Sequence, residues 1–201
     1  LHTAGVATRY LYAPEYLAER SSALPFPFHL IIGDKFGGSM DEAAFITWVN
    51  LRNIFSDLGR VFNIDFESYT LELGGEERIS IEEASKDLEY ILEYLSHKGL
   101  TRNSETKPEY KIIKCNKKDY KSYFAKQAGL YDFIAKPGQL IKKGDLLAIG
   151  INFENYFSEE SIKYEVLANE DCIVLTHYPS SSVMQGTEIY QVMEKVLLNY
   201  V

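Results

Sequence analysis

The feature that most constrains the fold of this chain is a change of pattern between residues 101 and 108. Before it, apolar runs alternate with amphipathic stretches, as in a layered α/β domain. The segment itself, TRNSETKP, is polar and has no apolar periodicity. After it, short apolar segments separated by turns follow at close spacing, which is typical of a small β-barrel or sandwich. The sequence therefore predicts an α/β fold with a layered domain over residues 1–103 and a small β domain over residues 108–195.

Two segments of the first part have the pattern of strands. FHLII, at 28–32, is a short apolar run between Pro27 and Gly33, which predicts a buried strand. YTLEL, at 69–73, combines β-branched and aromatic residues and stops at a pair of glycines. It predicts a strand that runs into a loop.

Two further segments have the pattern of helices. Asp41 is a candidate N-cap for a helix that places Phe45 and Val49 on one side. Ser80 is followed by a glutamate three residues later and by apolar residues at helical spacing, up to Gly99. The second segment predicts a long amphipathic helix.

The charge and cysteine content exclude several classes of protein. The formal net charge is -8, from 29 acidic and 21 basic residues, so nucleic acid is not an expected partner. No apolar run approaches the roughly 20 residues needed to cross a bilayer, so no membrane partner is expected. Cys115 and Cys172 belong to predicted strands and form no CxxC motif. We expect both to be buried and the protein to be cytoplasmic.

Three segments, taken in order, resemble the succinylglutamate desuccinylase/aspartoacylase family of zinc-dependent deacylases, which are similar to zinc carboxypeptidases. They are LHTAG at 1–5, YTLELGG at 69–75, and the run GLYDFIAKPGQLIKKGDLLAIG with IKYEVLANEDCIVL. The last run resembles the family's C-terminal β domain, a small barrel or hammerhead. It departs from the family pattern at Asn169, where proline is usual, and at Cys172, where glycine is usual.

The resemblance implies that His2 is one zinc ligand, and a neutral imidazole at the end of a strand suits Zn²⁺. In this family the other two ligands form an H-x-x-E pair upstream of this position. His29, His97 and His177 have no glutamate three residues later. Since the chain also begins with Leu, we expect the N-terminal part of the zinc domain to be missing. We then expect weak or absent zinc binding and no activity for the chain alone.

The resemblance also assigns Glu72 as the general base. Zinc lowers the pKa of its bound water toward ~7, and a nearby carboxylate can take the proton as the hydroxide attacks an amide carbonyl. The alternative from the residues alone is a glutamate that points into solvent or pairs with Arg78. If Glu72 is the base, its side chain should project into the same cleft as His2.

Arg9, seven residues after His2, is a candidate for binding a substrate carboxylate through two parallel hydrogen bonds. The alternative is an ordinary surface arginine.

The resemblance thus predicts a zinc-dependent amide hydrolase whose substrate is an N-acyl amino acid or a related small amide. Two alternatives remain, a zinc carboxypeptidase acting on peptides and a non-catalytic structural module. A biotinyl or lipoyl carrier has similar turns, but the corresponding link, NFENYFSEES, contains no lysine to modify. The β domain is expected to cover the active-site mouth or to mediate assembly, and a homo-oligomer is compatible with the second role.

Overall fold

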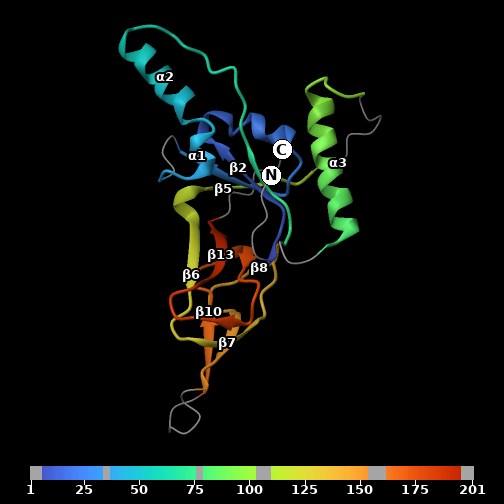
Figure 1. The fold of residues 1–201 in the computed structure, drawn as a ribbon, viewed down its shortest axis with the longest axis vertical. Helices are drawn as coiled ribbons and strands as arrows, with labels where there is room; N and C mark the ends of the chain where they lie inside the picture. The colour runs from blue at the N-terminus through green and yellow to red at the C-terminus, as the bar shows by residue number, and fades with distance from the viewer. Residues whose placement is uncertain (1–5, 34–36, 76–78, 103–109, 154–161, 196–201) are drawn as a thin grey trace.

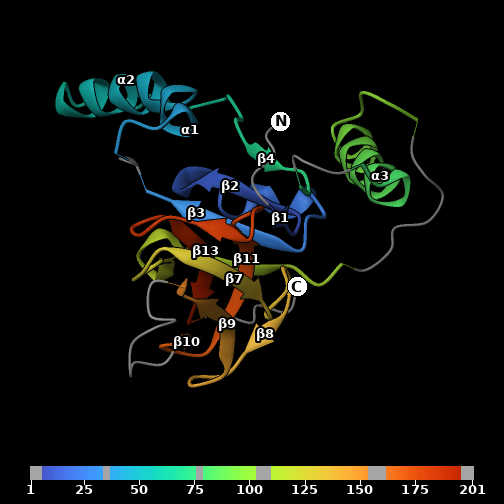
Figure 2. The same ribbon diagram turned by 60° about the horizontal axis from the view of Figure 1, so that its bottom comes forward.

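The computed structural model describes residues 6–33, 37–75, 79–102, 110–153 and 162–195. It has a mixed α/β fold with few helices and three sheets, which are stacked on one another (Figure 2). The α/β class predicted from the sequence is therefore confirmed. Among the described residues, no helix is both long enough and apolar enough to span a membrane.

The first sheet has the strand order β4-β2-β3-β5. Strand β3 (Phe28–Ile32) is parallel to β2 (Tyr10–Pro14) on one side and to β5 (Ile113–Asn116) on the other, while β4 (Thr70–Glu72) is antiparallel to β2. Every residue of β2 and β3 is buried, as expected for central strands covered on both faces. The predicted strand at 28–32 is confirmed residue for residue.

The helices connect the strands of the first sheet (Figure 1). Short 3-10 turns at Glu15–Leu17 and Arg20–Ala23 lie between β2 and β3, and α1 (Met40–Ala43) and α2 (Ile46–Asp57) follow β3. The long α3 (Ile81–His97) follows β4. It confirms the predicted helix, because the Ser80 hydroxyl caps it by accepting from the Glu83 N–H at 3.3 Å and the chain leaves it at Gly99 with φ 72°.

The helix predicted to begin at Asp41 differs from the prediction in two ways. Its cap is Ser39, whose hydroxyl accepts from the N–H of Glu42, so Asp41 lies inside the first turn. The predicted single helix is also interrupted between α1 and α2. There Phe45 takes a non-helical conformation and buries its ring in the core at 1% exposure, which accounts for the break.

The other two sheets are antiparallel. The second sheet has the order β1-β11-β13-β6, with β8 also paired to β11, and the third has the order β10-β9-β7-β12. The strands of the second are β1 (Val6–Ala7), β6 (Tyr120–Phe124), β8 (Leu140–Ile141), β11 (Cys172–His177) and β13 (Glu188–Glu194). Those of the third are β7 (Gly129–Phe133), β9 (Leu146–Ile151), β10 (Lys163–Leu167) and β12 (Ser182–Val183). A 3-10 turn at Lys117–Asp119 precedes β6.

The second sheet is the middle layer of the molecule. Along β11, Ile173 and Leu175 pack toward the first sheet, whereas Cys172 and Val174 pack toward the third, as the alternation of a strand requires. The opposite face of the first sheet is covered by α3. Both cysteines are free and buried, as predicted.

Two strands cross the predicted boundary between the domains. We call the first sheet with its helices the first lobe, and the second and third sheets together the second lobe. Strand β1, from the start of the described chain, belongs to the second sheet, where Val6 lies opposite His177. Strand β5, which follows the boundary, belongs to the first sheet. The two lobes are therefore interleaved in sequence.

Candidate active site

Glu72 is the last residue of β4 and is only 4% exposed. This excludes the alternative in which its side chain points into solvent; Arg78, the other suggested partner, lies outside the described residues. In the antiparallel pair of β4 and β2, Glu72 lies directly opposite Tyr10. Residues opposite one another in such a pair project from the same face of the sheet. Glu72 is thus held on the face that turns toward the second lobe.

Three tyrosine side chains lie on this face. Tyr10 and Tyr12 come from β2, with ring centroids 5.5 Å apart, and Tyr120 is the first residue of β6 in the second lobe. Tyr10 and Tyr12 are buried and Tyr120 is partly buried in the same apolar cluster. The phenol groups of Tyr10 and Tyr120 both interact electrostatically with that of Tyr12. A series of three phenol groups, from both lobes, therefore lies in one cluster next to the strand that carries Glu72.

The electrostatic environment keeps these phenols neutral. Burial, followed by the negative charge of Glu72, raises the pKa of Tyr10 above its usual range. Burial also raises the pKa of Tyr12 and of Tyr120, each with a further effect from the neighbouring tyrosine. At neutral pH the three groups can donate hydrogen bonds but carry no charge.

The structure brings together only part of the predicted site. His2 lies outside the described residues, so its position relative to Glu72 remains a prediction. Among the parts of the chain that are described, no group of three or more His, Cys, Asp and Glu side chains could hold a metal ion. His29 is completely buried, with ring nitrogens 3.0 Å from the Ser21 hydroxyl and 3.2 Å from the Leu24 carbonyl oxygen. His177 is stacked on Phe133.

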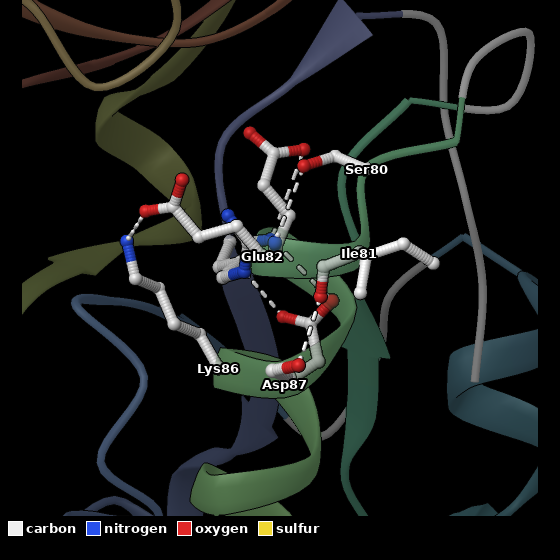
Figure 3. A network of polar contacts seen from close by, with 8 residues as sticks. Ser80, Ile81, Glu82, Lys86 and Asp87 are labelled. Atoms are coloured by element: carbon white, nitrogen blue, oxygen red, sulfur yellow. Dashed lines mark hydrogen bonds and ion pairs between the residues drawn. The ribbon is translucent and has the colours of Figure 1, made fainter.

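Arg9 lies just before β2 and contacts α3. Its Nε donates to the Asp87 carboxylate, and its Nη2 lies 3.8 Å from Glu83 Oε2. Its side chain is 13% exposed, so Arg9 is not an ordinary surface arginine. Figure 3 shows the first turns of α3, where Glu82 and Lys86 form a separate exposed pair and Asp87 belongs to the network with Arg9. A role for Arg9 in substrate binding remains a prediction.

The tyrosine series was missed in the sequence. The segment YLYAP does place two tyrosines at the period of a strand, which predicts that they share a face. However, no local pattern indicates that this face meets Glu72 or Tyr120, because the register between β2 and β4 and the packing of the lobes are long-range features.

Comparison with solved structures defines the fold class. A succinylglutamate desuccinylase/aspartoacylase-type protein of Shewanella frigidimarina NCIMB 400 is 36% identical, over 98% of this chain and 52% of its own, with a TM-score of 0.87. A succinylglutamate desuccinylase/aspartoacylase family protein of Shewanella amazonensis SB2B is 36% identical, over 98% of this chain and 53% of its own, with a TM-score of 0.86. The fold is therefore that of the desuccinylase/aspartoacylase proteins.

A more distant match shows the fold alone. The ectoine utilization protein EutE (DoeB) of Ruegeria pomeroyi, in a product-bound structure, is 17% identical, over 96% of this chain and 56% of its own, with a TM-score of 0.70. No protein-family model and no curated protein matches the sequence. The chain belongs to the succinylglutamate desuccinylase/aspartoacylase family, and it spans about half the length of the two Shewanella relatives.

Proposed function

We propose that the natural protein carrying this sequence is a deacylase that hydrolyses the amide bond of an N-acyl amino acid or a related small amide. The observation that carries the proposal is the buried Glu72 carboxylate at the end of β4, beside a series of neutral phenol groups. Its sequence context is the one that the family resemblance assigns to the general base. Family membership supports the same class of reaction.

In this proposal, Glu72 moves the proton of the reaction. Its carboxylate accepts a proton from the attacking water as the new C–O bond forms at the amide carbonyl. The C–N bond then breaks, and the same proton passes to the leaving amine. The products are an amine and a carboxylic acid, which releases its remaining proton to solvent to become a carboxylate, and Glu72 returns to its ionised form. Burial favours this role because a charge acts more strongly where water is excluded.

Zinc and its ligand His2 remain part of the proposal. The described residues do not by themselves form a zinc site, so the metal would need His2 together with ligands from elsewhere in the natural protein. We also propose that the first lobe is a zinc carboxypeptidase-like layered domain, that the second lobe is barrel-like, and that the protein is cytoplasmic, where free cysteines stay reduced.

The variant Glu72→Gln in the natural protein tests the proposal. It keeps the shape of the side chain and removes the base, so kcat for an N-acyl amino acid should fall by about 10²-fold or more. The zinc content should stay near normal. Glu165→Gln is a matched control, because Glu165 is an exposed strand glutamate on β10 in the second lobe.

Two results would contradict the proposal. If kcat of Glu72→Gln stays within a few-fold of the unmodified protein, Glu72 has a structural role. If the unmodified protein shows no turnover of any N-acyl amino acid offered, the reaction class itself is wrong.

A further inference from the structure

Residues 46–66, which we call the arm, comprise α2 and the segment that follows it. In both ribbon views α2 extends beyond the sheets instead of lying along them (Figure 1 and Figure 2). We propose that the apolar outer face of the arm is a dimer interface, on which the arm of a second copy of the same protein packs.

Helix α2 is apolar on two opposite sides. On one side, Val49 is 1% exposed and lies with Phe45 in the core of the first lobe. Leu51, Ile54 and Leu58 follow at intervals of three and four residues, so they share one side of the helix, roughly 140–200° around it from Val49. On that side Ile54 is 55% exposed and Leu58 68%. A helix that is apolar on both sides is normally covered on both.

The segment after α2 widens the outer face of the arm. The chain turns back at the end of the helix and places the ring of Phe62 against that of Phe55, with centroids 5.2 Å apart. Further along, the ring of Phe66 lies 5.5 Å from that of Trp48. These two ring pairs hold the returning segment beside the helix, yet Trp48 remains 39% exposed. The face is therefore held in shape by the arm itself but is not covered by the described part of the chain.

The charges of the arm indicate which partner covers this face. The arm carries two arginines and two aspartates, so its formal net charge is zero, whereas that of the whole chain is -8. Helix α3 also exposes leucines, with Leu88 at 56% and Leu92 at 45%, but it carries five acidic residues and one lysine. Two copies of α3 would repel one another, while two copies of the arm can approach without repulsion. The arm is therefore the exposed helix face that suits a second copy of this protein.

The shape of the arm suits a symmetric contact. In a two-fold dimer the same surface of each copy packs on the other. The 12 residues of α2 span about 18 Å, so the row formed by Leu51, Ile54 and Leu58 can interlock with the same row of the second copy. One helix with its returning segment makes a small interface. We therefore expect a dissociation constant in the micromolar range.

The test measures the mass of the natural protein and of two variants by sedimentation velocity, between about 1 µM and about 100 µM. Leu58→Arg places a charge within the outer face of the arm. Leu88→Arg is the matched control, because Leu88 is a similarly exposed helical leucine outside the arm. We expect the unmodified protein and Leu88→Arg to be dimeric at the upper concentration. The dissociation constant of Leu58→Arg should be higher by about 100-fold or more, because the dimer would bury an unpaired charge.

Three results of this measurement would overturn the proposal. They are a monomeric unmodified protein, a dissociation constant that Leu58→Arg leaves unchanged, and an equal loss of the dimer in Leu88→Arg.

Hydroxyl-radical labelling of the unmodified protein gives a second readout, which does not depend on a variant that folds. Ile54 and Val61 are 55% and 88% exposed in the single chain. In the dimer they should be labelled as little as the buried Leu30 and far less than Leu88. Strong labelling of Ile54 and Val61 in a dimer would overturn the proposal, because the contact would then lie elsewhere. A monomer in which both stay unlabelled would also overturn it, because another part of the natural protein would then cover the arm.

Discussion

The guanidinium of Arg9 is paired with the carboxylate of Asp87, which fastens the segment entering β2 to α3. Both side chains are only 13% exposed. An ion pair with little access to water is more sensitive to the loss of one partner than a surface pair, because the remaining charge is then poorly solvated.

A double-mutant cycle should therefore detect this pair. We expect Arg9→Gln and Asp87→Asn each to lower the free energy of unfolding, with a coupling energy of about 1–3 kcal/mol in the double variant. Urea unfolding measures all four proteins, and Lys86→Gln, which breaks an exposed pair with Glu82, is the control. A coupling energy near zero would show that the contact contributes nothing to stability. If Arg9 also binds a substrate carboxylate, Arg9→Gln should raise KM whereas Asp87→Asn should not.

Glu67 is expected to make stability depend on acid pH. Burial alone would raise the pKa of Glu67, but hydrogen bonds from Lys98 at 2.5 Å and Tyr94 at 2.8 Å outweigh it and hold the pKa below its ordinary value. A lowered carboxyl pKa stabilises the folded state above the unfolded value of about 4.3, and this contribution is lost as pH falls through the folded value.

Glu67→Gln should accordingly be less stable than the unmodified protein near neutral pH, and the difference should shrink in acid below about pH 4. Urea unfolding at the two pH values measures it. Glu82→Gln should show a smaller effect, since Glu82 pairs with Lys86 on the exposed surface. A difference for Glu67→Gln that stays constant with pH would contradict the assigned cause.

His29 is expected to make the stability of the fold depend on pH in a higher range than Glu67 does. Burial, with a smaller effect from Lys114, lowers the pKa of His29 to about 3. An unfolded histidine takes a proton near about 6.5, so between these values the unfolded chain binds one proton more and stability falls as pH falls. We expect the free energy of unfolding to fall by on the order of 1 kcal/mol for each unit by which the pH falls near about pH 5.

His29→Asn should remove this slope, while His97→Asn at the exposed end of α3 should not. Urea unfolding between about pH 7 and about pH 5 measures both. If His29→Asn does not fold, the ring resonances of His29 in the unmodified protein serve instead. They should show no protonation in this range, and protonation near the ordinary value would refute the prediction.

Metal analysis of the 201-residue chain should give well below one zinc per chain. A catalytic zinc needs about three protein ligands, and His2 is the single residue of this sequence that the family resemblance assigns. The measurement is elemental analysis after dialysis, together with an amidase assay with and without chelator. One tightly held zinc per chain would show that the ligand set is different.

Local signals predicted the elements that depend on local interactions. Strand β3 was predicted from an apolar run bounded by Pro27 and Gly33, and α3 was predicted from the Ser80 cap and Gly99. Strand β6 was not among the predicted strands, since its pairing with β13 joins segments far apart in the sequence. The break at Phe45 could not be predicted either, since it depends on the core that receives the ring.

The candidate site was predictable only in part for the same reason. Glu72 was singled out because the segment YTLELGG resembles the family segment that carries the general base. The position of Tyr10 beside Glu72 depends on the register between two strands about 60 residues apart. The position of Tyr120 depends on how the two lobes pack. These relationships exist only in the folded molecule.

The interleaving of the two lobes has a consequence for how the chain acquires its structure during synthesis. Strand β1 cannot pair until β11, which comes much later in the sequence, has been synthesised. Strand β3 lacks one of its two neighbouring strands until β5 has been synthesised. Pairings between such distant segments are slow to form, because the entropy lost on closing the long loop between them is not offset until the contacts have formed. The first sheet therefore cannot be completed before β5 is made, and its face toward the second lobe stays uncovered until β11 and β13 follow.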